Sequence, residues 1–260
     1  MITVQYASDL HLEFVQNRAH LRKYPLIPVA ELLILAGDVV PLQDFPKYRE
    51  FFEVWAGQFK QIYWVPGNHE YYHGDLAEHK GSFLKHLLPN LTLLNNQVAE
   101  TSGLRLIFST LWSKTNPAHA YILQKNLNDF QLIHYQKKRY TPDLYNRQHA
   151  EALQFLNTAL TVSNSGPTIV VTHHVPTFRH YPEQYRGDIL NEAFASDLDD
   201  LVSASGAAYW IYGHHHRNIP PFLLGQTQLV TNQLGYVQYG EHQSFSHRKV
   251  LEVPVNPQML

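Results

Sequence analysis

The sequence predicts an α/β fold in which strands alternate with helices. Apolar runs at residues 31–36 and 61–65 enclose an amphipathic stretch at 46–57, which gives the order strand, helix, strand. Central strands as apolar as these are typical of parallel sheets that are covered on both faces. A chain of 260 residues can bury a large core, and no Pro-, Ser- or Gly-rich linker divides it, so we expect one domain over residues 1–260.

The first half of the chain supplies most of the expected strands. Its elements, in order, are a strand at 2–7, an irregular segment at 14–29, a strand at 31–36, a helix at 46–57, a strand at 61–65, a helix at 75–88, and strands at 91–94 and 104–109. Pro25 and Pro28 oppose a continuous helix in the irregular segment. Pro46 suits the first turn of the next helix, where its missing N–H leaves no hydrogen bond unmade.

The second half of the chain contains a segment with a weak pattern. We expect residues 112–142 to form a lid-like insertion with a short helix around 119–127. The elements expected after it are a helix at 143–162, a strand at 168–172, a helix at 191–202, a strand at 208–212, and short alternating runs at 219–224, 227–231 and 248–253. Alternation, with Pro and Gly between the runs, indicates antiparallel strands that close a second sheet.

The composition limits the classes of function. A formal net charge of -2 gives no reason to expect a broad cationic surface, so a nucleic-acid polymer is not the expected partner. The chain has no cysteine, which excludes disulfides and thiolate zinc sites and fits a reducing compartment. No apolar run is long enough to span a membrane, and no signal segment precedes strand 2–7, so we expect a cytoplasmic protein without a membrane partner. The oligomeric state stays open.

Five short motifs place Asp, His and Asn side chains directly after apolar runs. They are Asp9-Leu10-His11, Gly37-Asp38, Gly67-Asn68-His69-Glu70, His173-His174 and Gly213-His214-His215-His216. Each motif alone is common in loops, but five of them at successive strand ends indicate one polynuclear metal site. The carboxylate of Asp38 can bridge two ions because it offers two acceptor oxygens. A mixture of imidazole, carboxylate and amide ligands suits Mn, Fe or Zn better than Ca or Mg.

The order of these motifs resembles the signature of calcineurin-like metallophosphoesterases, which runs Asp-x-His, Gly-Asp, Gly-Asn-His-Asp/Glu, His, Gly-His-x-His. The resemblance implies a four-layer αββα sandwich of two mixed sheets, with a dinuclear metal centre at one sheet edge. It implies two divalent or trivalent transition-metal ions, manganese first, with iron and zinc as alternatives. The implied ligands are Asp9, His11 and His216 for one ion, Asn68, His173 and His214 for the other, and Asp38 as the bridge.

The resemblance also implies an activity. Members of this family hydrolyse phosphoesters by attack of a metal-bound hydroxide, so we expect a small phosphodiester or phosphomonoester as substrate. The histidine that corresponds to His69 is not a ligand in similar enzymes, and it serves the leaving-group oxygen as the catalytic acid. The segment after Asp38 lacks the Asp-Arg-Gly of protein Ser/Thr phosphatases, and Pro41 replaces the tyrosine of purple acid phosphatases. The chain is more similar to small bacterial members, including the class III cyclic nucleotide phosphodiesterases.

Three further residues are candidates for contact with the substrate. They are His174, Arg179 and Arg217, and for each one an ordinary surface or hydrogen-bonding role is the alternative. A rival function is a non-enzymatic protein-interaction scaffold on the same fold, as in the retromer subunit that this family includes. That subunit lacks the catalytic histidine, whereas His69 and every ligand position are present here. A histidine-rich metal-binding protein without catalysis would explain the histidines but not Asn68.

Overall fold

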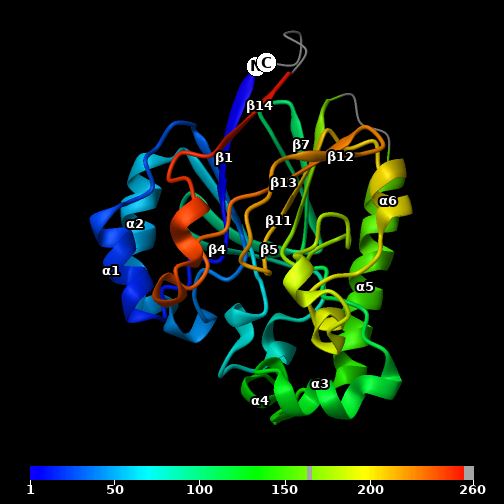
Figure 1. Cartoon of the computed structure of the whole chain (residues 1–260). Coiled ribbons are helices and arrows are strands. Elements are labelled where there is room, and N and C mark those ends of the chain that lie inside the picture. The colour runs from blue at the N-terminus through cyan, green and yellow to red at the C-terminus, as the bar shows by residue number, and fades with distance from the viewer. Residues whose placement is uncertain (163–165, 255–260) are drawn as a thin grey trace.

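The protein folds into two six-stranded mixed sheets that lie face to face, with helices on their outer faces (Figure 1). The computed structural model describes residues 1–162 and 166–254. The strand order is β14-β1-β2-β3-β5-β4 in the first sheet and β12-β13-β11-β10-β7-β6 in the second. The predicted four-layer sandwich of two mixed sheets is therefore confirmed.

The strands of the first sheet are β1 Ile2–Ala7, β2 Leu32–Ala36, β3 Gln61–Val65, β4 Phe83–Leu88, β5 Leu91–Asn95 and β14 Val250–Val253. Those of the second sheet are β6 Gln97–Thr101, β7 Leu104–Ser109, β10 Thr168–Thr172, β11 Tyr209–Tyr212, β12 Phe222–Leu224 and β13 Thr227–Thr231. A separate hairpin joins β8 His134–Tyr135 to β9 Lys138–Arg139. In each sheet four neighbouring strands run parallel, β1-β2-β3-β5 and β7-β10-β11-β13, so their carboxyl ends meet at one edge.

The α-helices are α1 Val15–Lys23, α2 Arg49–Gln58, α3 Ala120–Asn126, α4 Asp129–Leu132, α5 Pro142–Thr161 and α6 Asp199–Ala204. The 3-10 helices are η1 Leu42–Tyr48, η2 His69–Tyr71, η3 Leu76–His79, η4 Pro117–His119, η5 Glu183–Tyr185, η6 Ile189–Ala193, η7 Val237–Tyr239 and η8 Glu241–Ser244. Among the residues described, no helix combines the length and the apolar character that a membrane crossing requires.

Alternation of side chains along the strands builds the layers. In β2, Leu33 and Leu35 pack against the layer of α1 and α2, whereas Ile34 faces the core between the sheets. In β10 the pattern is the same, because Val171 enters the core between the sheets and Val170 packs against α5. Both faces of the central strands are buried, which is why their sequences are apolar throughout.

Several predicted elements differ in the structure. Residues 15–23 form α1, contrary to the expected irregular segment, because Pro25 and Pro28 lie beyond the end of that helix. The prediction of a helix at 75–88 is wrong. Gly81 adopts a φ of 63°, and the chain then returns as the edge strand β4, which runs antiparallel to β5. The strand β6 was not expected, and it pairs with β7 in the same way.

Two differences concern the second half of the chain. The helix expected at 191–202 is interrupted, because Ala195 forms a bridge with Val175 and only η6 and α6 remain helical. Of the three late runs, β12 pairs antiparallel with β13, but β13 itself runs parallel to β11. The last run does not join the second sheet, since β14 pairs antiparallel with β1 in the first sheet.

The segment 112–142 carries the expected short helix as α3, and it has a core of its own. Trp112, Phe130 and Tyr140 are buried together with Tyr71 and Tyr145, which belong to the main body. Because these aromatic residues pack continuously across the boundary, we propose that the chain is one domain and that this segment is a packed insertion. Figure 1 shows it as the lobe below the sheets, where α3 and α4 lie.

The packing of α5 on the second sheet can be tested with one substitution. Leu156 is fully buried there, so we expect Leu156→Ala to lower the free energy of unfolding by about 2–5 kcal/mol. The matched control is Leu223→Ala on the edge strand β12, where the side chain is 63% exposed, with an expected loss below about 1 kcal/mol. Urea titration measures both variants, and equal losses would contradict this account of the packing.

Candidate active site

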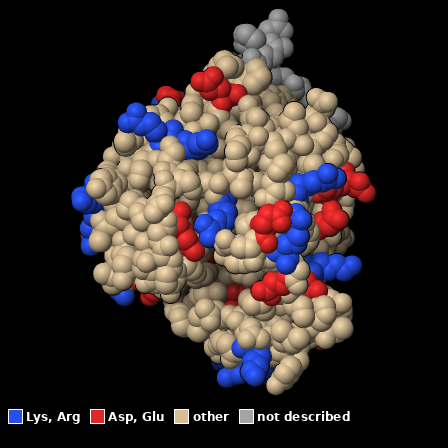
Figure 2. Space-filling model, in the orientation of Figure 1, with Lys and Arg blue, Asp and Glu red and all other residues tan. Residues whose placement is uncertain are grey.

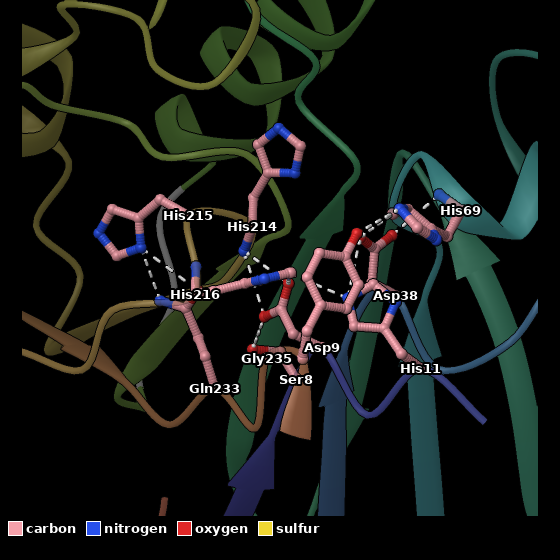
Figure 3. Close-up of polar contacts among 12 residues, drawn as sticks. Ser8, Asp9, His11, Asp38, His69, His214, His215, His216, Gln233 and Gly235 are labelled. Carbon is pink, nitrogen blue, oxygen red and sulfur yellow. Dashed lines mark hydrogen bonds and ion pairs between the residues drawn. The ribbon is translucent and has the colours of Figure 1, made fainter. Parts of the chain in front are cut away.

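The five polar motifs converge at the edge where the parallel strands end. Figure 3 labels residues of four of them, among which are Asp9, Asp38, His69 and His214. The first sheet contributes three of them, after β1, β2 and β3, and the second sheet contributes two, after β10 and β11. The side chains brought together are those of Asp9, His11, Asp38, Asn68, His69, His173, His214 and His216. In open α/β sheets this edge is the expected position of a ligand site.

Five of these residues have a left-handed backbone. The φ angles are 56° for Asp9, 48° for His11, 54° for Asp38, 81° for His214 and 53° for His216. Such conformations are costly for residues other than glycine, and they persist where surrounding contacts fix them, often at functional sites. Here the contacts join the motifs: the Asp9 N–H donates to Gly37 O at 2.9 Å, and the His11 N–H donates to Asp38 O at 3.0 Å.

A first group of metal-ligand type consists of Asp9, His11, Asp38 and His216, whose ligand atoms lie within 4.8 Å of one another. The Nε2 atoms of His11 and His216 are 2.9 Å apart. His216 Nε2 also lies 3.4 Å from Asp9 Oδ1, and His11 Nε2 lies 3.9 Å from Asp38 Oδ2. Two imidazoles and two carboxylates directed at one point form a donor set that fits a transition-metal ion.

A second group consists of Asp38, His173 and His214, and Asn68 adjoins it. His173 Nε2 lies 3.4 Å from Asp38 Oδ1, 3.1 Å from His214 Nδ1 and 3.2 Å from Asn68 Oδ1. Asp38 therefore directs Oδ2 to the first group and Oδ1 to the second. The two buried groups suit a dinuclear metal site, in which a carboxylate so placed could reach an ion in each group.

Burial and neighbouring charges act differently on the candidate ligands. Burial lowers the pKa of His173 and His216, but Asp38 outweighs that effect at His173 and raises its pKa to about 9, and Asp9 raises the pKa of His216 to about 10. A metal ion must therefore displace a proton from each of these two imidazoles. Burial alone would raise the pKa of Asp38, but the surrounding histidines, His173 foremost, hold it well below its usual range. For His214, burial and the nearby His174 keep the imidazole pKa well below its ordinary value. A charged carboxylate and a neutral imidazole are the forms that metal ligands require.

A cavity of about 340 Å³ opens beside the two groups. Asp38, His69 and His214 line it on the side of the sheets, and residues 126–129 of the insertion line it on the other. Figure 2 shows the surface hollowed above the lobe that α3 and α4 form. A small molecule in this cavity would contact both groups.

A family model described as calcineurin-like phosphoesterase matches residues 3–218 of the chain. The chain belongs to the calcineurin-like phosphoesterase family. It is 30% identical over 263 residues to the uncharacterized protein L509 of Acanthamoeba polyphaga mimivirus, a match that covers 91% of this chain and 92% of that protein. The phosphopantetheinyl hydrolase PptH of Mycobacterium tuberculosis has a similar fold, with a TM-score of 0.71, 17% identity, and coverage of 98% of this chain and 97% of that one.

One residue of this phosphoesterase site, Glu13, was not predicted from the sequence. Glu13 Oε1 accepts hydrogen bonds from Nδ1 of His69 at 2.7 Å and from Nδ1 of His11 at 3.1 Å. Burial raises the pKa of Glu13, but His11 and His69 outweigh that effect and lower it to about 2. The signal in the sequence was a carboxylate two positions after His11, but Asp9 and His11 have a left-handed backbone, so the alternation of an extended strand does not apply here.

Two more carboxylates, also missed as site residues, hold the phosphoesterase motifs in place. Asp129 of α4 accepts from Asn68 Nδ2 and from the Tyr72 hydroxyl, both at 2.8 Å, and so fixes the amide of Asn68. Glu70 accepts from the backbone N–H groups of Asp38 at 2.8 Å and Val39 at 2.6 Å. These bonds tie the turn after β2 to the turn after β3.

None of the three residues expected to contact the substrate lines the cavity. His174 is buried, and its Nε2 and Nδ1 lie 3.0 Å from the Tyr145 hydroxyl and 3.1 Å from Thr110 O. Arg179 is exposed and forms an ion pair with Asp199 at 2.7 Å. Arg217 is exposed at the rim. Their role in substrate binding stays a prediction that this geometry does not support.

The shared position of Asp38 gives a prediction for metal content. We expect the purified protein, dialysed against Mn²⁺, to retain about two ions per chain, as dinuclear sites do. Asp38→Asn should retain one or none, because an amide cannot supply two anionic oxygens. Elemental analysis by mass spectrometry measures the ions, with His119→Asn as the control, since His119 pairs with Glu192 outside the site. Full retention by Asp38→Asn would contradict the bridging geometry.

Proposed function

We propose that this phosphoesterase is dinuclear and hydrolyses a small phosphodiester or phosphomonoester. The proposed ligands are Asp9, His11 and His216 for one ion, Asn68, His173 and His214 for the other, and Asp38 for both. The observation that carries the proposal is the placement of the two Asp38 oxygens, each 3.4–3.9 Å from imidazole nitrogens of a different group. Manganese is the first choice, with iron and zinc as alternatives, because oxygen and nitrogen donors are mixed.

Two such ions, when bound, acidify a water molecule and offset the charge of the phosphoryl oxygens. The task of the protein groups is to orient these ligands. Glu13 holds His11 through Nδ1, which leaves Nε2 as the ligand atom. In the same way, Asp129 holds Asn68 through its Nδ2, which leaves Oδ1 directed at the second group. Outer hydrogen bonds of this kind fix ligand orientation in metal sites.

His69 is the proposed catalytic acid. Its Nδ1 donates to Glu13, so Nε2 is the atom that faces the cavity, 3.9 Å from Asp38 Oδ2. Burial lowers the pKa of His69, but Asp38 and Glu13 outweigh that effect and raise it above its ordinary value. A protonated Nε2 can donate to the leaving-group oxygen as the ester bond breaks. A non-enzymatic scaffold on this fold would need neither this orientation nor the shared carboxylate.

Three further proposals concern the insertion, the location of the protein and its partner. We propose that the insertion 112–142 forms a wall of the substrate cavity, since residues 126–129 line it. A cytoplasmic location is proposed from the absence of cysteine. The proposed partner is a small phosphoester, with no membrane and no nucleic-acid polymer.

Two chromogenic substrates test the activity. We expect the Mn-loaded protein to hydrolyse bis-p-nitrophenyl phosphate or p-nitrophenyl phosphate. His69→Ala should keep its metal and lose about 10²–10⁴-fold in kcat, because only the proton donor is removed. Loss of metal from a folded His69→Ala variant would show that His69 is a ligand. If the loaded wild type cleaves neither compound, the scaffold alternative gains support.

The pairing of Glu13 with His69 gives a prediction for pH dependence. The carboxylate raises the pKa of His69, so the charged acid is present below that pKa and is lost as the pH rises through it. We expect Glu13→Gln to move the basic limb of the kcat profile to lower pH, and to lower kcat about tenfold. The control is Glu53→Gln, an exposed residue paired with Arg49. An unchanged basic limb would show that Glu13 does not raise the pKa of the catalytic acid His69.

A further inference from the structure

Outside the candidate metal ligands, the charged groups on the described cavity wall are three carboxylates and the imidazole of His69, the proposed acid. Asp129, Asp188 and Glu241 line the cavity, and no lysine or arginine is among the described residues that do so. Glu241 bonds His216 Nδ1 at 2.8 Å, and Asp188 lies at the exposed rim, where it accepts from the Leu190 N–H at 2.9 Å. In Figure 2 both acidic and basic atoms lie beside the hollow above the lobe. Asp129 is engaged by Asn68 and Tyr72, and Glu241 by His216, so Asp188 is the carboxylate whose charge a substrate group at this rim would meet.

The arginines nearest to this wall are engaged elsewhere. Arg186 lines an adjoining hollow and pairs with Glu183 at 2.7 Å. Arg179 pairs with Asp199, and Arg217 interacts with Glu241 from the rim without lining the cavity. A second phosphate or a carboxylate on the substrate would thus find no lysine or arginine on the described wall, although such groups are usually bound by these residues.

Aromatic rings form much of the same wall. Tyr72, Tyr181, Tyr185 and Tyr236 line the cavity, and Phe194 stacks on His214 with ring centroids 4.6 Å apart. Aromatic faces attract cations through their electron density, most strongly where water is excluded. Carboxylates and tyrosine rings together make a surface that recognises a positively charged nitrogen group.

We propose that the substrate is a phosphoester whose remaining part carries a cationic nitrogen group, such as a primary or quaternary amine. The phosphoryl group faces Asp38 and the two groups of candidate ligands. The cation faces Asp188, Glu241 and the tyrosines. This inference rests on the proposed function, because it assumes that the phosphoryl group binds at the metal groups. One cavity of about 340 Å³ spans both ends, which is ample for a two-carbon or three-carbon link between them.

Three phosphonates with the same two-carbon link test the inference without hydrolysis. They are 2-aminoethylphosphonate, propylphosphonate and 2-carboxyethylphosphonate, which carry a cationic amine, a neutral methyl group or an anionic carboxylate on that link. Isothermal titration calorimetry of the Mn-loaded wild type should give a Kd about tenfold lower for the amine than for the propyl compound. The Kd for the carboxylate should be at least about tenfold higher than that for the propyl compound. Equal affinities for the amine and the propyl compound, or tight binding of the carboxylate, would overturn the proposal.

A charge-removing substitution at the rim sharpens the test. Asp188→Asn keeps an oxygen that can accept from the Leu190 N–H, so the turn is retained while the charge is lost. We expect it to weaken aminoethylphosphonate binding about threefold and to leave propylphosphonate unchanged. Asp143→Asn is the matched control, since Asp143 is exposed on α5 and outside the cavity lining. Equal losses for both phosphonates would count against recognition of the cation by Asp188.

Hydrolysis of bis-p-nitrophenyl phosphate and p-nitrophenyl phosphate separates this inference from the proposed function. If the loaded enzyme cleaves either compound while the three phosphonates bind without the expected order, the function stands and the cationic substrate is rejected. If the enzyme cleaves neither compound and binds none of the phosphonates, both are rejected.

Discussion

The whole site depends on one close approach, in which the ring of His173 lies against Gly37 and Gly67. A Cβ on either glycine would overlap that ring, and a Cβ on Gly67 would also overlap Asp38 Oδ1. The φ of Gly67 is not positive, so the backbone conformation does not require glycine at this position. The close contact with His173 and Asp38 does. The contact joins the two sheets, because His173 follows β10 and Asp38 follows β2. Without this contact, His173 could not lie beside Asp38 in the second group of candidate ligands.

Around this contact, buried carboxylates orient the other groups. Glu70 ties together two turns, Glu13 holds two histidines, and Asp129 holds Asn68 from the insertion. Each acid accepts from more than one donor, which offsets part of the cost of its burial. At Glu13 the offset is incomplete, because Oε2 has no hydrogen-bond partner among the described residues. The insertion is therefore part of the site's support as well as a wall of its cavity.

The fold could be predicted where sequence and burial agree. Strands such as β2 and β10 are apolar because both their faces are covered, and that signal is local. The edge strand β4 has exposed residues and no such signal, and β14 gives no indication that it pairs with β1. In the site, residue types at strand ends indicated a metal centre. The contact of Asp129 with Asn68, 61 positions apart, depends on how the insertion packs.

The pairing of β14 with β1 has a practical consequence. Ile2 lies opposite Val253, and Figure 1 shows the start of β1 and the end of β14 on the side away from the α3–α4 lobe. The candidate ligands begin only after β1, which at about 3.3 Å per residue spans roughly 20 Å. A protein anchored to a bead or a sensor surface near these two strand ends would therefore present its cavity to the solution.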